Sequence, residues 1–388
     1  MRLYLCLFGL LACVVCCVLF LMYQTEMVIH DHGYPVSTIL EVHNTSSYGR
    51  ERESSPSSIA VRRDFTSDGR ESSPSHIAVR RDFTCYPANP VPAFLPKSHQ
   101  EFIRYKHCRE YPILLSPSPC GEDVYLLLVV KSLAKQVDRR AALRDTWARE
   151  GLVRGRRVKL IFLLGRSVDI REDNNTQDML RSESLHYGDI LQWDFADTFF
   201  NLTLKEVGFL RWFSESCSHS NGGGSGGPQF VFKGDDDVFV NTANLIRFLK
   251  GRNPDVHLFT GDIIPYARPI RNRHKKYFIS WYIYGDNPYP PYAGGGGYLM
   301  SRTTVFGLNE AAKSTELFPI DDVYTGFCLK KMGVRPRRHP GFLTFGFRRG
   351  PKQRLNPCAY RGIMLVHKLN PVELRAMWPQ VNNGTIRC

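Results

Sequence analysis

The sequence lacks the signatures of several common metal and nucleotide sites. The seven cysteines beyond residue 22 are scattered without Cys-x-x-Cys spacing, which argues against a zinc site. The glycine-rich stretch 221–228 lacks the Lys and Ser/Thr of a phosphate-binding P-loop, so a flexible surface loop is favoured. A dense group of His and Asp residues is also missing, which argues against a two-metal phosphodiesterase or hydrolase.

Charge is absent from the apolar stretch Leu3–Met22. A stretch of this length is enough to cross a bilayer as a helix. A cleaved signal peptide would have a shorter apolar core and small residues at its cleavage site, so we favour a retained signal-anchor. Arg2 precedes the span, whereas Glu26 and Asp31 follow it. This asymmetry predicts a cytoplasmic tail at residues 1–2 and a lumenal or extracellular C-terminal part.

Residues 23–104 lack sustained hydrophobic periodicity and are rich in Ser, Pro and Arg. Within them, residues 52–84 hold an 18-residue tandem repeat, in which 52–66 recurs as 70–84; two copies are too few and too polar for a solenoid. We therefore predict a disordered stem that sets the distance between the membrane and a folded domain. That domain is expected over residues 105–388.

Acidic residues are fewer than basic ones. The sequence has 37 Asp and Glu and 51 Lys and Arg, which gives a formal net charge of +14. Such an excess is often found in nucleic-acid-binding proteins. A membrane-tethered lumenal chain would rarely meet nucleic acid, so we predict no such partner. The basic residues cluster at 268–276 and 335–354. We expect some of them to face an anionic ligand, and these loops to favour sulfated or otherwise acidic glycans.

Scattered cysteines on the lumenal side indicate disulfide bonds. Their odd number leaves at least one free or joined to another chain. We favour the pairs Cys358–Cys388 and Cys217–Cys328, and the stem residue Cys85 is a candidate bridge in a homodimer. The seven are Cys85, Cys108, Cys120, Cys217, Cys328, Cys358 and Cys388. Sequons for N-glycosylation, which a lumenal chain can use, begin at Asn44, Asn174, Asn201 and Asn383.

Three consecutive carboxylates, Asp235, Asp236 and Asp237, stand between two short runs of β-branched and aromatic residues. Such runs are typical of buried strands, where unpaired adjacent carboxylates would repel each other and lose hydration. In extended backbone Asp235 and Asp237 share one face and Asp236 points away. A few hard oxygen ligands suit Mg²⁺ or Mn²⁺ bound to a diphosphate. The alternative is a surface turn rich in Asp.

Apolar strands alternate with helical patterns from residue 124 onward, which predicts an α/β fold with a mostly parallel central sheet flanked by helices. Ligands bind beyond the carboxyl ends of such strands, where the Asp cluster would lie. Asp321 and Asp322 form a second acidic pair at an expected helix start. The four glycines at 294–297 lie between tyrosines, and His367 ends an apolar run. Each of these features also has a purely structural explanation.

Together these motifs resemble the animal β1,3-glycosyltransferases, in particular the β1,3-N-acetylglucosaminyltransferases. The resemblance covers roughly residues 105–388 and excludes the stem. Related β1,3-galactosyltransferases usually carry Asp-x-Asp in a different setting and Glu-Asp-Val before the glycine, whereas this chain has Gly-Asp-Asp-Asp and Ile-Asp-Asp. The matching segments are 139–147, 197–206, 232–241, 292–297 and 321–326.

The resemblance implies a GT-A fold, a UDP-sugar donor, Mn²⁺ or Mg²⁺, inversion at the anomeric carbon, and residence in the Golgi membrane as a type II protein. It makes Asp322 the catalytic base and Asp321 its support. It also makes Asp237 the direct metal ligand, with His367 as the second protein ligand. Asp235 and Asp236 would hold the ribose or metal-bound water, and Asp235 also belongs to the metal group.

Four further residues receive a donor-binding role from the resemblance. Arg144 and Lys205 would meet the uridine or the diphosphate, and Gly295 and Gly296 the donor sugar. The implied reaction moves GlcNAc from UDP-GlcNAc in β1,3 linkage to a terminal galactose of an N-acetyllactosamine-type glycan on a glycoprotein or glycolipid. The alternatives are transfer of galactose from UDP-Gal, and an inactive paralogue that binds UDP or a glycan.

Overall fold

The computed structural model describes residues 85–87, 90–121, 123–169, 173–217, 227–347 and 351–388, which belong to one unit, Ala78–Cys388. The predicted anchor at 3–22, the stem repeat and Asn44 lie outside the described residues. None of the helices within the described ranges has the length and apolar character needed to span a membrane. Most of α2 falls in the predicted stem, yet its Phe102 is buried in the core.

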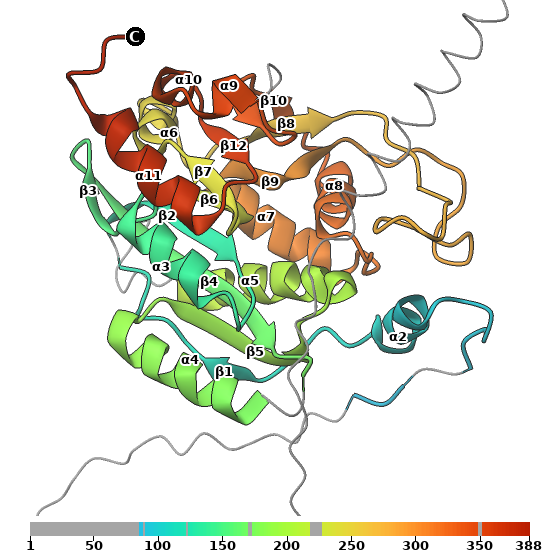
Figure 1. Cartoon of the computed structure of the whole chain (residues 1–388). Helices are drawn as coiled ribbons and strands as arrows, with labels where there is room; N and C mark the ends of the chain where they lie inside the picture. Colours follow the sequence, from blue (N-terminus) through green and yellow to red (C-terminus); the bar gives the residue numbers. More distant parts are fainter. Residues whose placement is uncertain (1–84, 88–89, 122, 170–172, 218–226, 348–350) are drawn as a thin grey trace, which may run out of the picture. The chain divides into compact units, whose positions relative to one another are not determined.

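A nine-stranded sheet forms the middle of the described structure (Figure 1). Its strands lie in the spatial order β1-β5-β4-β2-β6-β9-β8-β10, and β3 pairs with the beginning of β4. The strands are β1 (Ile113–Leu115), β2 (Val124–Lys131), β3 (Gly151–Val153), β4 (Arg156–Arg166), β5 (Ile190–Ala196), β6 (Phe230–Asp235), β8 (Phe259–Ile264), β9 (Tyr292–Ser301) and β10 (Arg337–Arg338).

The sheet is mixed in direction. Strands β5, β4, β2 and β6 pair in parallel, as predicted, but β9 is antiparallel to both β6 and β8. The prediction of a mostly parallel sheet is therefore wrong for the second half of the fold. The segment between β8 and β9 contains no crossover helix, so the chain returns beside β8 in the opposite direction.

Helices cover both faces of this sheet and build two cores. In β2, Leu127 and Val129 join the core under α5, α7 and α8, whereas Leu128 and Val130 join the core under α3, α4 and α11. This alternation confirms the predicted doubly buried strand. The helices are α2 (Lys97–Tyr105), α3 (Val137–Asp145), α4 (Asp173–Tyr187), the short η1 (Phe199–Asn201), α5 (Leu202–Ser216), α6 (Thr242–Leu249), α7 (Arg302–Lys313), α8 (Asp321–Lys331), α9 (Pro351–Arg354), α10 (Pro357–Arg361) and α11 (Pro371–Asn382).

A second, three-stranded sheet has the order β11-β12-β7. Its strands are β11 (Phe342–Leu343), β12 (Leu365–His367) and β7 (Val238–Val240). The register places His367 opposite Val238, one residue after the Asp run. Trp147 fixes this edge, because its buried indole Nε1 donates a hydrogen bond to the Val238 carbonyl at 2.8 Å. The small sheet thus brings the C-terminal histidine to the end of β6.

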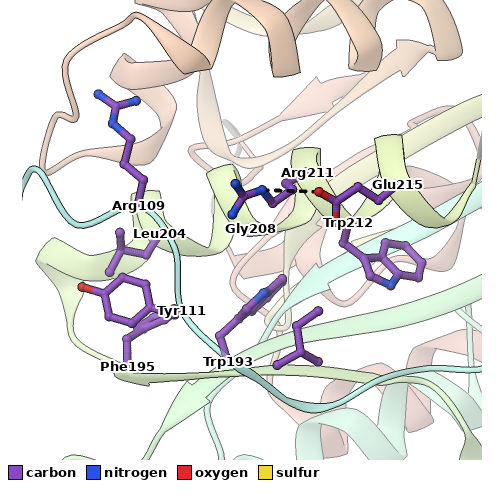
Figure 2. A pocket seen from close by; sticks show the side chains of 10 residues that line it. Arg109, Tyr111, Trp193, Phe195, Leu204, Gly208, Arg211, Trp212 and Glu215 are labelled. Atoms are coloured by element: carbon purple, nitrogen blue, oxygen red, sulfur yellow. Dashed lines mark ion pairs between the residues drawn. The ribbon is translucent and has the colours of Figure 1, made fainter. Parts of the chain in front are cut away.

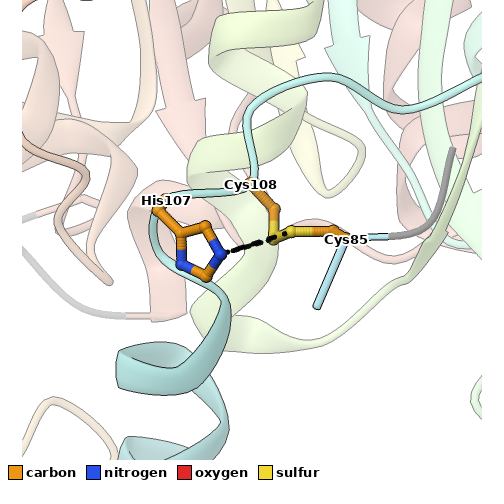
Figure 3. Close-up of side chains that lie close together, drawn as sticks. All are labelled: Cys85, His107 and Cys108. Carbon is orange, nitrogen blue, oxygen red and sulfur yellow. Dashed lines mark hydrogen bonds between the residues drawn. A yellow bond between two sulfur atoms is a disulfide. The ribbon is translucent and has the colours of Figure 1, made fainter. Parts of the chain in front are cut away.

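Three disulfides connect described cysteines. Cys358–Cys388 confirms the prediction. Cys217 pairs with Cys120, so the predicted Cys217–Cys328 bond is wrong; Cys328 is free and buried on the inner side of α8. The proposed interchain role of Cys85 is also wrong, because Cys85 pairs with Cys108 of the same chain (Figure 3).

Candidate active site

Segments far apart in the sequence end at one place. Lys131 is the last residue of β2 and the register partner of Asp235, the last residue of β6. His367 ends β12, and Asp321 begins α8. The carboxyl ends of parallel strands meet at one edge of a sheet, and a helix N-terminus favours negative charge. The fold therefore gathers acidic and basic groups at this edge.

The Asp run occupies a turn rather than a continuous strand. Strand β6 stops at Asp235, and Asp236 and Asp237 form the turn that leads into β7. Asp236 accepts hydrogen bonds from Ser132 Oγ at 2.7 Å and from Arg139 Nη1 at 2.9 Å, and the same Arg139 atom lies 3.7 Å from Asp237. The Asp236 side chain is buried and internally satisfied.

Asp235, Asp237 and His367 form a group whose ligand atoms all lie within 4.8 Å of one another. His367 Nε2 lies 3.0 Å from Asp237 Oδ1 and 4.0 Å from Asp235 Oδ2. Although burial opposes both effects, the contact between them raises the pKa of His367 and lowers the pKa of Asp237. The two predicted metal carboxylates and the predicted histidine are thus together.

The hydrogen bonding of His367 fits a divalent cation. Its Nδ1 lies 3.0 Å from the Thr344 carbonyl, which can only accept, so Nδ1 carries a proton. In the neutral imidazole, Nε2 is then an acceptor that faces the acceptor oxygen of Asp237. A cation bound by Nε2 and the two carboxylates would satisfy both acceptor atoms. A backbone carbonyl as partner of the other ring nitrogen is typical of metal-bound histidine. The carboxylate oxygens suit a hard divalent cation, and the imidazole is a ligand that divalent transition metals accept.

The two carboxyl groups at the start of α8, Asp321 and Asp322, have different neighbours and therefore pKa values shifted in opposite directions. Asp321 is buried and accepts a hydrogen bond from Lys131 Nζ at 2.6 Å, and Lys131 also reaches Asp235 at 3.0 Å. Although burial acts against it, the charges of Lys131 and Lys233 lower the pKa of Asp321. Burial raises the pKa of Asp322 well above its usual range, and the adjacent Asp321 charge adds to this effect. Asp322 is therefore the proton-accepting member.

The glycine run lets β9 approach this acidic pair. A Cβ atom on Gly295 would lie 2.8 Å from Asp322 Oδ2, so only glycine leaves room for the carboxylate. A Cβ on Gly296 would lie 3.5 Å from the ring of His367, within ordinary contact distance. The first of these glycines is therefore needed for the position of Asp322, a reason that the sequence did not reveal.

A cavity of about 570 Å³ opens beside these groups. Asp235, Asp322 and His367 line it together with Gly295. The remaining wall is basic and aromatic, and it includes Arg268, Lys276, Lys368, Tyr277, Tyr289, Tyr292 and Phe345. The buried hydroxyls of Tyr289 and Thr344, two of the lining residues, have no hydrogen-bond partner within the described structure. Such a wall suits a polar ligand with flat apolar faces.

Comparison with known proteins identifies the family. The family described as Galactosyltransferase matches residues 138–340. The chain belongs to this family. A Mus musculus protein named N-acetyllactosaminide beta-1,3-N-acetylglucosaminyltransferase 4 is 46% identical over 76% of this chain and 81% of its own length. UDP-GlcNAc:betaGal beta-1,3-N-acetylglucosaminyltransferase 7, also of Mus musculus, is 50% identical over 74% of this chain and 71% of its own length.

Within this galactosyltransferase-family fold, Arg144 and Lys205 lie apart from the cavity. Arg144 forms ion pairs with Asp189 and Glu183 at 2.8 Å each. Lys205 is buried and pairs with Asp197 at 2.8 Å. Neither residue lines the cavity, and both head groups already have internal partners. This geometry gives the predicted contact with uridine or diphosphate no support.

Two other groupings lack the chemistry of the main site. A cavity of about 210 Å³ between β5 and α5 has aromatic walls, and its Arg211 pairs with Glu215 (Figure 2). His107 lies 3.6 Å from Cys85 Sγ, but that sulfur is bonded to Cys108 and is no thiolate ligand (Figure 3). The Asp235–His367 edge is therefore the candidate functional site of this family member.

The sequons differ in exposure. Asn174 and Asn383 are exposed, whereas Asn201 is half-buried and its amide donates to the Ala196 carbonyl at 2.8 Å.

Sequence reasoning missed two site residues, Lys131 and Arg139. The available signal for Lys131 was a single charged residue at the end of an otherwise apolar strand.

Proposed function

We propose that this chain is an inverting, metal-dependent glycosyltransferase with a GT-A type fold. It transfers GlcNAc from UDP-GlcNAc in β1,3 linkage to a terminal galactose of an N-acetyllactosamine-type glycan. The observation that carries the proposal is the meeting of a candidate metal group, Asp235, Asp237 and His367, with a carboxyl group of raised pKa, Asp322, at one cavity. The names of the relatives support the choice of sugar and linkage.

The reaction requires a base for the acceptor hydroxyl. In the proposed mechanism Asp322 removes the proton from the 3-hydroxyl as that oxygen attacks C1 of GlcNAc. The bond between C1 and the diphosphate oxygen breaks, the electron pair leaves with UDP, and the configuration at C1 inverts. A raised pKa brings the carboxyl group closer to the pKa that is best for proton transfer near neutral pH. Asp321 stays ionised because Lys131 neutralises it.

Asp235, Asp237 and His367 would hold the divalent cation. When bound, such a cation supplies a positive charge for the diphosphate leaving group. Lys131 bridges this group and the acidic pair, with Nζ at 3.0 Å from Asp235 and 2.6 Å from Asp321. It therefore holds the metal carboxylate and the start of α8 in fixed relation. Gly295 keeps the space that the Asp322 carboxylate needs.

The proposed setting is the Golgi lumen. The apolar stretch at 3–22 would anchor the chain as a type II protein, and the stem would follow it and end before α2, whose Phe102 packs in the core. Three disulfides in the described part fit an oxidising compartment. We expect N-linked sugars on Asn174 and Asn383 before Asn201, because the first two are exposed.

The test offers the full-length chain UDP-GlcNAc and UDP-Gal in competition, with Mn²⁺, over galactose- and GlcNAc-terminated acceptors. Incorporation of β1,3-linked GlcNAc on terminal galactose is the expected result. Galactose incorporation would keep the proposed base and metal group but change the donor. UDP binding without transfer from either donor would overturn the proposal in favour of an inactive paralogue.

A further inference from the structure

Lys368 has an unusual backbone conformation directly beside the candidate metal group. Among the described residues, it and Arg154 are the non-glycine residues with positive φ, at 68° and 49°. Arg154 and Gly155 form the two-residue loop between β3 and β4, where a left-handed conformation is expected. Lys368 lies in no hairpin, because it connects β12 to α11. Its left-handed backbone, which is unfavourable for a residue with a Cβ atom, needs another explanation.

The conformation turns the chain back toward the metal group. Directly after Lys368, the backbone N–H of Leu369 donates to the Asp237 carbonyl at 2.8 Å, and the Leu369 side chain is buried. The side chain of Lys368 remains exposed and lines the cavity with His367 and Asp235. The strain therefore does two things at once. It ties Asp237 to the chain after β12, and it places Lys368 in the lining of the cavity.

The Lys368 ammonium group lacks an internal counter-ion. Within the described residues, no carboxylate lies within ion-pair distance of Lys368, whereas Lys131 and Arg139 each have one. An ammonium group carries three donors and has no acceptor, so a bound anion would satisfy it. The cavity position next to His367 places that anion beside the candidate cation site. A diphosphate fits this position, because lysine binds phosphate as a point charge.

We propose that Lys368 is a donor-binding residue whose ammonium group contacts the diphosphate of the UDP-sugar. This inference rests on the proposed function. It names a contact on the donor side, separate from the metal group and the base. It also explains why strain is maintained at this position, since a relaxed backbone would direct the side chain elsewhere.

The test measures the affinity of the full-length chain for UDP and for uridine by calorimetry with Mn²⁺. Lys368→Gln is expected to weaken UDP binding about tenfold, as expected for the loss of one charge-assisted contact, and to leave uridine binding unchanged. Lys368→Arg should retain most of the UDP affinity. Lys368→Gly should lose as much affinity as Lys368→Gln although it relieves the backbone, which separates the charge from the conformation. The matched control is Lys250→Gln, an exposed lysine outside the cavity.

Three outcomes would overturn the inference. Equal UDP affinity in wild type and Lys368→Gln removes the diphosphate contact. Unchanged UDP affinity with a raised KM for the glycan acceptor moves the residue to the acceptor side. Equal losses for UDP and uridine indicate a structural role of the side chain. Failure of the wild type to bind UDP at all is a different result, because it contradicts the proposed function itself.

Discussion

Two clusters of charged residues both include arginines of helix α3, and they differ in how completely their charges are paired. At one, Arg144 and Arg140 share Glu183, and Arg144 also pairs with Asp189. At the other, Lys131, Arg139, Lys233 and five carboxylates surround the ends of β2 and β6. The first cluster pairs its charges internally. The second leaves Asp322 without an ion-pair partner among the described residues and lines a cavity.

The difference indicates that the first cluster stabilises the fold, whereas an incompletely paired group beside a cavity is available to a ligand. Arg139 and Arg144 belong to the same sequence motif, yet Arg139 contacts the Asp run and Arg144 supports α4. The pKa directions follow the same division. Although burial opposes it, paired arginines lower the pKa of Glu183, whereas burial beside Asp321 raises the pKa of Asp322. The predictions below test this division.

The largest effect is expected at the proposed base. Asp322→Asn should lower kcat at least about a hundredfold, because general base catalysis contributes roughly 10²–10⁴-fold. UDP binding with Mn²⁺ should stay close to that of the wild type, since the substitution retains the size of the side chain. Turnover measurements and calorimetry check both statements. Turnover within a few-fold of wild type would exclude Asp322 as the base.

The next effect concerns the candidate metal group. His367→Ala removes the imidazole that faces Asp237 at 3.0 Å. We expect the Mn²⁺ concentration for half-maximal activity to rise about 10–100-fold, as is typical when metal coordination is weakened. A titration with Mn²⁺ at saturating donor measures this. An unchanged metal requirement would remove His367 from the ligand set, and His339→Ala is a matched control at a histidine outside the cavity.

The third prediction separates Arg139 from Arg144. Arg144→Met should lower the free energy of unfolding by about 3 kcal/mol, because it leaves the buried carboxylate of Asp189 without its ion pair. Its KM for UDP-GlcNAc should stay within about twofold of wild type. Arg139→Met should show the reverse, a smaller stability loss and altered donor or metal dependence. Denaturant unfolding and initial rates decide this. A raised KM with normal stability in Arg144→Met would restore its predicted donor contact.

Local patterns in the sequence predicted many of the residues of the candidate site. They predicted few of the contacts between those residues. The start of α8 at Asp321 and the doubly buried β2 followed from local patterns. The contact of Lys131 with Asp321 joins residues 190 positions apart, and no local pattern encodes it. The Cys217 pairing failed for the same reason, because spacing does not reveal which cysteines, such as Cys120 and Cys217, meet in the folded chain. Contacts between residues far apart in the sequence determine the ion pairs and the disulfide pairing that the motifs could not predict.

The smallest expected effect is on how stability changes with pH. Asp322 in one cluster and Glu183 in the other change the stability in opposite directions as pH falls. Asp322 has a raised pKa in the folded state, so its contribution to stability increases as pH falls through that pKa, while activity is lost. Glu183 has a lowered pKa, so its contribution is present above about 4.3, the unfolded value, and is lost as pH falls further.

These signs predict a window, above about pH 4.3 and below the pKa of Asp322, in which the protein is folded but reversibly inactive. Activity with saturating Mn²⁺ and circular dichroism, both measured at the same pH values, check it. Asp322→Asn should raise the Tm at neutral pH by about 2 °C, because it removes the cost of a buried carboxylate, and should abolish that part of the pH dependence. Loss of structure at the same pH as loss of activity would contradict the prediction. The two clusters would then respond to acid as one unit, and the contrast between paired and unpaired charges would fail.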